Sequence, residues 1–142
     1  MREQSSVSEG LQTAREHQRA IIAGIKKTET EIRSAKNFRY VLLNESSGTG
    51  IISEVMTRYR YPDKPFITLN EVEDKIKISA RGTRKLVTSG LDLAAAMREA
   101  SASVGGMGGG HDVASGATIP KGTAEQFIET ADAIIGKQLR AS

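Results

Sequence analysis

Two stretches of the sequence carry residue types that can bind phosphates and nucleotides. The first is a glycine run followed by one of the chain's two histidines: Gly105, Gly106, Gly108, Gly109, Gly110 and His111. Glycines allow positive φ and a close approach of the backbone, so several N–H groups can cradle a phosphate. His111 can add a hydrogen bond or a positive charge. A linker would also be glycine-rich, but the compact segment "VASGATI" follows at once, which favours a ligand-facing loop.

The second stretch is "KIKISARG", in which apolar and polar residues alternate. Ile76, Ile78 and Ala80 are apolar, and this period of two is typical of a strand with one buried face. The polar residues between them share the opposite face: Lys75, Lys77, Ser79 and Arg81. Together with Arg84, which follows shortly afterwards, they are candidates for contacts with an anionic ligand.

Two further motifs have simple structural explanations. "SSGTGIIS" has Gly48 and Gly50 but Ser53 where a dinucleotide fingerprint has glycine or alanine, and the segment after Glu71 resembles a hairpin. We therefore favour a plain turn and helix cap there. The arginines and tyrosines of "RYRY" (58–61) can stack bases and neutralise phosphates, but the arginines also suit a helix C-terminus, and we favour that interpretation.

Composition narrows the class of protein. The chain has 142 residues, 38% of them hydrophobic, which is enough for one domain with a real core. It has no cysteine, which excludes disulfides and cysteine-ligated metals and suits a reducing, cytoplasmic setting. No apolar run approaches the length of a membrane span, so we expect no membrane association. The net charge of +3 permits a phosphate-bearing partner without requiring one.

The expected elements begin with a long N-terminal helix. Ser6 and Glu9 have capping-box spacing. A narrow apolar stripe follows at helical spacing, interrupted by Gln18 and Thr28: Leu11, Ala14, Ile21, Ile25 and Ile32. The stripe fits packing on a neighbouring surface or, less well, a coiled-coil seam. His17 lies off the stripe, where we expect a solvated side chain.

The remaining pattern predicts a mixed body. We expect a strand at 40–43, a helix at 51–59, a hairpin at 66–81, a helix at 91–103, a strand at 113–119 and a final helix capped by Thr123. Ser89 and Asp92 have capping-box spacing before the third helix. The predicted fold is α/β (or α+β), with a mixed central sheet of about four or five strands flanked by helices and a long N-terminal helix.

At the glycine run the sequence resembles a known family. "GGGHDVASGATIP" is similar to the G-G-G-H-x-x-A-A-G motif of the DHH-associated domain, the C-terminal half of DHH-superfamily phosphoesterases. Gly108 to His111 match, as do Ala114 and Gly116, while Ser115 replaces the usual alanine. The resemblance covers about residues 38–139, and the sequence is most similar to that of archaeal RecJ-like single-strand-specific nucleases.

A second segment supports the resemblance. "KISAR" is similar to the family strand in which a serine and an arginine precede the glycine run by one helix. Ser79 and Arg81 take those places, although Gly82 stands where many members have serine. We therefore expect residues 1–36 to form a connector helix and residues 37–142 to form the substrate-binding domain.

The resemblance implies that substrate binding and hydrolysis are carried out by two different domains. In the family, this domain closes over single-stranded DNA or RNA, or a short oligonucleotide, and the equivalents of Arg81 and His111 contact phosphate or base. Hydrolysis belongs to a preceding DHH domain, whose aspartates and histidines hold manganese or magnesium ions. We expect no cofactor in this chain, which would be the C-terminal part of a longer protein and would pack on that DHH domain.

Residue counts agree with this expectation. A two-metal site needs several aspartate and histidine ligands, but the only histidines are His17 and His111, and neither has metal-ligand spacing around it. We expect this chain to bind nucleic acid without hydrolysing it.

Three alternatives stay open. One is a tRNA-binding or oligomerisation module, because alanyl-tRNA synthetases carry a related C-terminal domain. There a basic residue and a proline-aspartate pair usually follow the glycine run, whereas here His111 follows directly. Another is a structural domain that forms a homodimer through the N-terminal helix. A complete enzyme ranks third, because no catalytic groups are visible.

Overall fold

The chain folds around one six-stranded mixed sheet. The computed structural model describes residues 14–16, 18–19, 22–23, 31–43 and 61–140. The sheet order is β1-β2-β3-β4-β6-β5. The strands are β1 (Arg33–Ser34), β2 (Arg39–Leu43), β3 (Phe66–Val72), β4 (Lys75–Arg81), β5 (Met107–Gly110) and β6 (Ala114–Pro120). The helices are α3 (Arg84–Thr88), α4 (Leu93–Ala102) and α5 (Ala124–Arg140).

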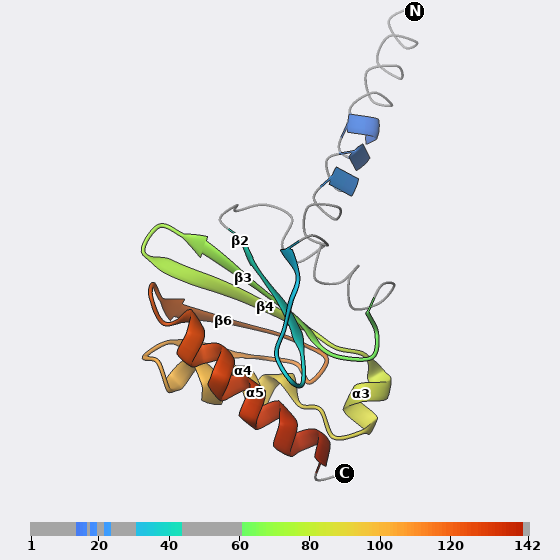
Figure 1. Ribbon diagram of the computed structural model, residues 1–142, viewed down its shortest axis with the longest axis vertical. Helices are drawn as coiled ribbons and strands as arrows, with labels where there is room; N and C mark the ends of the chain where they lie inside the picture. The colour runs from blue at the N-terminus through green and yellow to red at the C-terminus, as the bar shows by residue number, and fades with distance from the viewer. Residues whose placement is uncertain (1–13, 17, 20–21, 24–30, 44–60, 141–142) are drawn as a thin grey trace, which may run out of the picture.

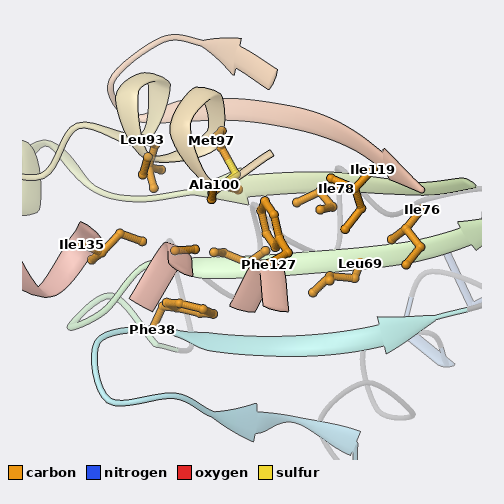
Figure 2. Packing of buried hydrophobic residues seen from close by; sticks show 14 of the residues in the cluster. Phe38, Leu69, Ile76, Ile78, Leu93, Met97, Ala100, Ile119, Phe127 and Ile135 are labelled. Carbon is orange, nitrogen blue, oxygen red and sulfur yellow. The ribbon is translucent and has the colours of Figure 1, made fainter. Parts of the chain in front are cut away.

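Only β2 and β3 run parallel; every other neighbouring pair in this sheet is antiparallel. Helices α4 and α5 lie together against one face of the sheet (Figure 1). In β4, Ile76, Ile78 and Ala80 are buried, as their alternation predicts. They pack with side chains of α4 and α5 in one core, which Figure 2 shows around Met97 and Phe127.

A smaller apolar cluster lies on the other face, at the β2–β3 side. Val41 and Phe66 are fully buried there, and Ile32, Leu43 and Tyr61 pack against them. This face is therefore divided. Its β2–β3 part is apolar, whereas the part formed by β4, β6 and β5 carries the polar residues and glycines.

Helix α5 is tied to two distant segments by hydrogen bonds. The Asp132 carboxylate accepts from the Asn37 backbone N–H at 2.8 Å and the Asn37 side-chain amide at 3.1 Å. Gln138 accepts from the Asp92 N–H and donates to the Asp92 carbonyl, both at 2.9 Å. The helix thus fixes the turn before β2 and the start of α4.

Several sequence predictions are confirmed. β2 covers the strand expected at 40–43, β3 and β4 form the expected hairpin, and α5 begins directly after Thr123. The helix predicted at 51–59, the "SSGTG" turn, His17 and all of "RYRY" except Tyr61 lie outside the described residues.

Other predictions were wrong. The sheet has six strands, not four or five, because β1 and β5 add one at each edge. β1 consists of Arg33–Ser34, two residues expected to be helical, which pair with Tyr40 and Arg39 of β2. In the described part of the chain, the long helix is α5 at the C-terminal end and not an N-terminal one. Residues 14–16, 18–19, 22–23 and 31 are helical, and the rest of the predicted N-terminal helix lies outside the described residues.

The caps of the middle helices also differ from expectation. The segment contains an additional short helix, α3, and Ser89 is its C-cap and not part of a capping box with Asp92. Asp92 is itself the N-cap of α4, and its side chain accepts from the Ala95 N–H at 3.2 Å. Within the described residues, no helix is both long and apolar enough to cross a membrane.

Candidate functional site

The residues predicted to bind a ligand gather on one surface, which we call the outer face. It consists of the positions of β4, β6 and β5 that alternate with the core positions and so point away from α4 and α5. Ser79 of β4 lies beside Gly116 of β6, which in turn lies beside Gly109 of β5. A Cβ added at Gly109 would have no heavy atom within 4 Å. This row, the glycine strip, is a place where a ligand can approach two backbones closely.

The next row brings Arg81 and His111 together. Arg81 pairs with Ala114, and the His111 N–H donates to the Ala114 carbonyl at 2.8 Å. Because neighbouring strands lie about 4.8 Å apart, the backbones of Arg81 and His111 are about 10 Å apart. His111 is exposed, and Arg81 is partly buried, with its Nη1 donating to the Ala80 carbonyl at 2.9 Å. Arg81 and His111 therefore flank Ala114 in this row.

Two lysines extend the positive charge along β4. Lys77 pairs with Thr118, which pairs with Met107, and Lys75 pairs with Pro120. Both lysines are exposed. Lys75, Lys77 and Arg81 therefore form one edge of the outer face, as the alternation in the sequence predicts.

The glycines serve different purposes. Gly105 has φ 81° and ends the α4 turn, where its N–H donates to the Ala102 carbonyl at 3.2 Å. A Cβ at Gly106 would collide with the Thr118 carbonyl, and one at Gly108 would lie 2.6 Å from the Met97 carbonyl. A Cβ at Gly110 would lie 2.8 Å from Ser115 Cα. Packing or turn geometry thus accounts for four of the five glycines.

Consequently, the glycine run is not the loop that the sequence predicts. Met107–Gly110 is an edge strand, and only Gly109 has neither a close neighbour at its Cβ position nor a helix-ending role. Small residues allow β5 to lie tightly between β6 and α4. The part of the run that is open to a ligand is therefore limited to Gly109 and the following His111.

The loop that carries His111 is held in place by neighbouring segments. The Asp112 carbonyl accepts from the Leu93 N–H at 3.0 Å, and the Val113 carbonyl accepts from the Gly82 N–H at 2.9 Å. Arg84 Nη1 lies 3.4 Å from Asp112 Oδ2. Arg84 thus forms a contact with a carboxylate of the loop that carries His111.

Arg39 occupies the same row as Arg81 but has other partners. Through Phe66 it is aligned with Arg81 across β3, and it forms a bidentate pair with Asp63, at 2.7 and 3.2 Å. Its guanidinium also lies 4.8 Å from the Tyr61 ring centroid. The hydrogen bonds from Arg39 lower the pKa of Asp63 below its usual value. Arg39 therefore belongs to a structural contact at the border of the outer face.

A cavity of about 510 Å³ opens where β5 begins and β6 ends. Its walls include Gly105, Gly106 and Met107 on one side and Thr118, Ile119 and Pro120 on the other. Asp74 and Lys75, from the β3–β4 hairpin, complete it. The sequence analysis missed this cavity, although the alternation in "MGGGH" and "ASGATIP" would have placed Met107 and Thr118 on the outer face.

The described residues do not provide a metal centre. Among them, no group of three or more histidine, cysteine, aspartate and glutamate side chains is arranged to hold an ion. The arrangement present can instead hold an anion: Lys75, Lys77 and Arg81 border a surface of exposed backbone on one side.

Comparisons with known proteins agree with this architecture. The DHHA1 domain model matches residues 36–137. An uncharacterized protein of Methanocaldococcus jannaschii is 41% identical over 119 residues, which are 81% of this chain and 26% of that protein. This chain therefore spans about a quarter of the length of that relative.

Solved structures share the fold at low identity. A DHH domain from a protein described as a member of a ribosomal protein family has a TM-score of 0.65 at 18% identity, over 92% of this chain and 33% of that one. A pGpG-specific phosphodiesterase from Vibrio cholerae has 0.57 at 16%, over 84% and 40%. The C-Ala domain of Aquifex aeolicus alanyl-tRNA synthetase has 0.58 at 15%, over 76% and 97%.

Proposed function

Because this chain belongs to the DHHA1 domain family, we propose that it is the substrate-binding domain of a RecJ-like DHH phosphoesterase. Its outer face binds the phosphates of single-stranded DNA or RNA, or of a short oligonucleotide. Hydrolysis is carried out by a DHH domain in the same parent protein, which holds manganese or magnesium. Arg81 and His111 contact the phosphate, and Ser79, Gly109 and the lysines of β4 guide the strand.

The observation that carries this proposal is the register of β4, β6 and β5. Arg81, Ala114 and His111 form one row, and the glycine strip forms the next. A guanidinium and an imidazole on either side of small residues give charge-assisted hydrogen bonds to a phosphate without steric obstruction. Lys75 and Lys77 continue the positive charge in the direction that a strand of nucleic acid would follow.

The test is a binding titration of the 142-residue chain with a 5′-phosphorylated, fluorescently labelled single-stranded oligonucleotide at low salt. Arg81→Ala and His111→Ala should each weaken binding, the arginine variant by about tenfold or more, as a charge-assisted hydrogen bond to phosphate is lost. Arg98→Ala is the matched control, because Arg98 is an exposed arginine on α4, on the other side of the sheet.

Circular dichroism of each variant shows whether the fold is retained. Wild-type affinity in both folded variants would contradict the assignment of Arg81 and His111. Equal losses for Arg81→Ala and Arg98→Ala would mean that binding depends only on net charge.

A second candidate is a tRNA-binding or oligomerisation module. The observation that favours it is the C-Ala likeness, which covers almost all of that domain. In that case the chain would prefer a folded tRNA to a single strand, or its mass would rise with concentration whether or not nucleic acid is present. Competition between tRNA and the oligonucleotide, followed by analytical ultracentrifugation, separates these functions.

A further inference from the structure

The cavity at the start of β5 lies on the same surface as the phosphate row. Lys75, Thr118, Pro120 and Met107 all occupy outer-face positions, and all four line the cavity. Met107 lies four residues before His111 on the same stretch of chain. At about 3.4 Å per residue, the cavity and the Arg81–His111 row are therefore about 14 Å apart.

The exposed Met107 side chain distinguishes this cavity from an ordinary surface hollow. Met107 is 82% exposed, although it is a large apolar residue. A thioether is polarizable and makes favourable contacts with aromatic rings. Gly105, which also lines the cavity, leaves open space there, because a Cβ added to it would have no heavy atom within 4 Å. The volume lies within the range of small-molecule sites.

The remaining lining suits a polar heteroaromatic ring. Asp74 offers carboxylate oxygens that can accept from an exocyclic amine, and the Thr118 hydroxyl can donate or accept. Lys75 supplies a positive charge beside the cavity for a neighbouring phosphate. This combination of a thioether, hydrogen-bonding groups and an ammonium matches a nucleobase on a charged backbone better than it matches an aliphatic ligand.

We infer that this cavity is a base-binding subsite, in which Met107 stacks on a nucleobase of the strand whose phosphate lies between Arg81 and His111. The inference rests on the proposed function. At about 3.4 Å per stacked nucleotide, a separation of about 14 Å corresponds to about four nucleotides, and to fewer in an extended strand. The subsite therefore favours oligonucleotides long enough to reach both places, and a mononucleotide is too short to do so.

The test compares a 5′-phosphorylated mononucleotide with a hexanucleotide, using the 142-residue chain. Met107→Gln should weaken hexanucleotide binding by about 2- to 10-fold, the range of a sulfur–aromatic contact, and leave mononucleotide binding unchanged. Lys75→Gln should also affect only the hexanucleotide. Lys137→Gln is the matched control, because Lys137 is exposed on α5. Arg81→Ala should weaken both ligands.

A direct readout is the methyl NMR signal of Met107. A base that stacks on the thioether shifts this signal upfield through its ring current. A hexanucleotide that keeps only its first base, with abasic sites elsewhere, should bind without that shift. The same upfield shift with the abasic ligand would overturn the base-binding subsite.

The two proposals fail in different ways. If Arg81→Ala weakens both ligands but Met107→Gln weakens neither or both equally, the base-binding subsite is wrong and the phosphate row stands. If Arg81→Ala and His111→Ala leave the affinity for the ligands unchanged, the proposed function is wrong, and so is the base-binding subsite that rests on it.

Discussion

The five glycines between α4 and the His111 loop illustrate how one residue type meets several physical demands. Gly105 adopts a left-handed conformation to end α4, and Gly106 and Gly108 let β5 lie against β6 and α4 at distances that a Cβ would prevent. Within β5, Gly109 faces open space. The glycines of this motif therefore mainly allow close packing of the backbone, and only Gly109 within β5 is open to a ligand.

This account predicts that Gly106→Ala is destabilising. The added Cβ would collide with the Thr118 carbonyl and lie 2.9 Å from Ile119 Cγ2. Overpacking of this kind costs about 1–3 kcal/mol of unfolding free energy, measurable by urea denaturation. Met107→Ala is the neighbouring control and should change the unfolding free energy by less than about 0.5 kcal/mol, because Met107 is mostly exposed. Equal stability of Gly106→Ala and the wild type would mean that β5 can move away from β6.

A second residue-level prediction concerns pH. Hydrogen bonds from Arg39 lower the pKa of Asp63, so the carboxylate contributes stability above its unfolded pKa of about 3.9 and loses it as the pH falls through the lower, folded pKa. Asp63→Asn should reduce the unfolding free energy at pH 7 by only about 0.2–1 kcal/mol, because the Asp63 side chain is 61% exposed. The difference from the wild type should shrink as the pH falls below the unfolded pKa and disappear once the pH is below the lower, folded pKa. A difference that persists there in urea denaturation would show that the ion pair is not its cause.

At the level of elements, α5 holds two distant segments of the chain in place through side-chain hydrogen bonds. Its Asp132 carboxylate receives hydrogen bonds from the turn before β2, and its Gln138 holds the first residues of α4. These contacts connect segments that lie far apart in the sequence and keep the sheet and both helices in one unit.

Asp132→Ala should therefore destabilise the domain by about 1–3 kcal/mol, because the partly buried Asn37 backbone N–H loses its acceptor and the Asn37 side-chain amide keeps only the Asp132 backbone carbonyl. Thermal and urea unfolding measure this effect. Glu129→Ala, one turn earlier on an exposed position of the same helix, should have little effect. Similar losses in the two variants would contradict a specific role for the Asp132 contacts.

The strands differ in how well the sequence predicts them. Alternation in 75–81 predicted both the strand and its polar face, because a period of two follows directly from backbone geometry. The composition of 105–110 predicted a loop, yet Met107–Gly110 forms β5, because contacts with α4 and β6 outweigh the low strand propensity of glycine. β1, with two residues, is too short to give a periodic signal.

The candidate site was predictable to a similar extent. Ser79, Arg81 and His111 were named from local patterns, but their alignment depends on the pairing of β4 with β6 and of β6 with β5. The cavity beside Met107 arises from three separate segments of the chain, which no local pattern can reveal.

At the scale of the whole molecule, the two faces of the sheet differ in what they contact. One face is covered by α4 and α5 and supplies the core (Figure 2), while the β4–β6–β5 part of the other face presents charge and backbone. A net charge of only +3 means that the proposed nucleic-acid binding must depend on local clustering of charge more than on total charge.

The salt dependence of binding tests this local clustering. For single strands, each phosphate contact makes the slope of log affinity against log salt more negative by about 0.7. Arg81→Ala should make the slope less negative by about that amount, and Arg98→Ala should leave it unchanged. A slope insensitive to Arg81 would indicate that the arginine does not neutralise a phosphate.

The most direct test of the central claim, that the outer face of β4, β6 and β5 binds single-stranded nucleic acid, is an NMR titration. The ¹⁵N-labelled chain is titrated at low salt with a short 5′-phosphorylated oligonucleotide. We predict that the amide signals of Ser79, Arg81, Gly109 and His111 shift together and saturate, while those of exposed α5 residues stay in place. Saturable shifts confined to other surfaces, with these four signals unchanged, would contradict the claim.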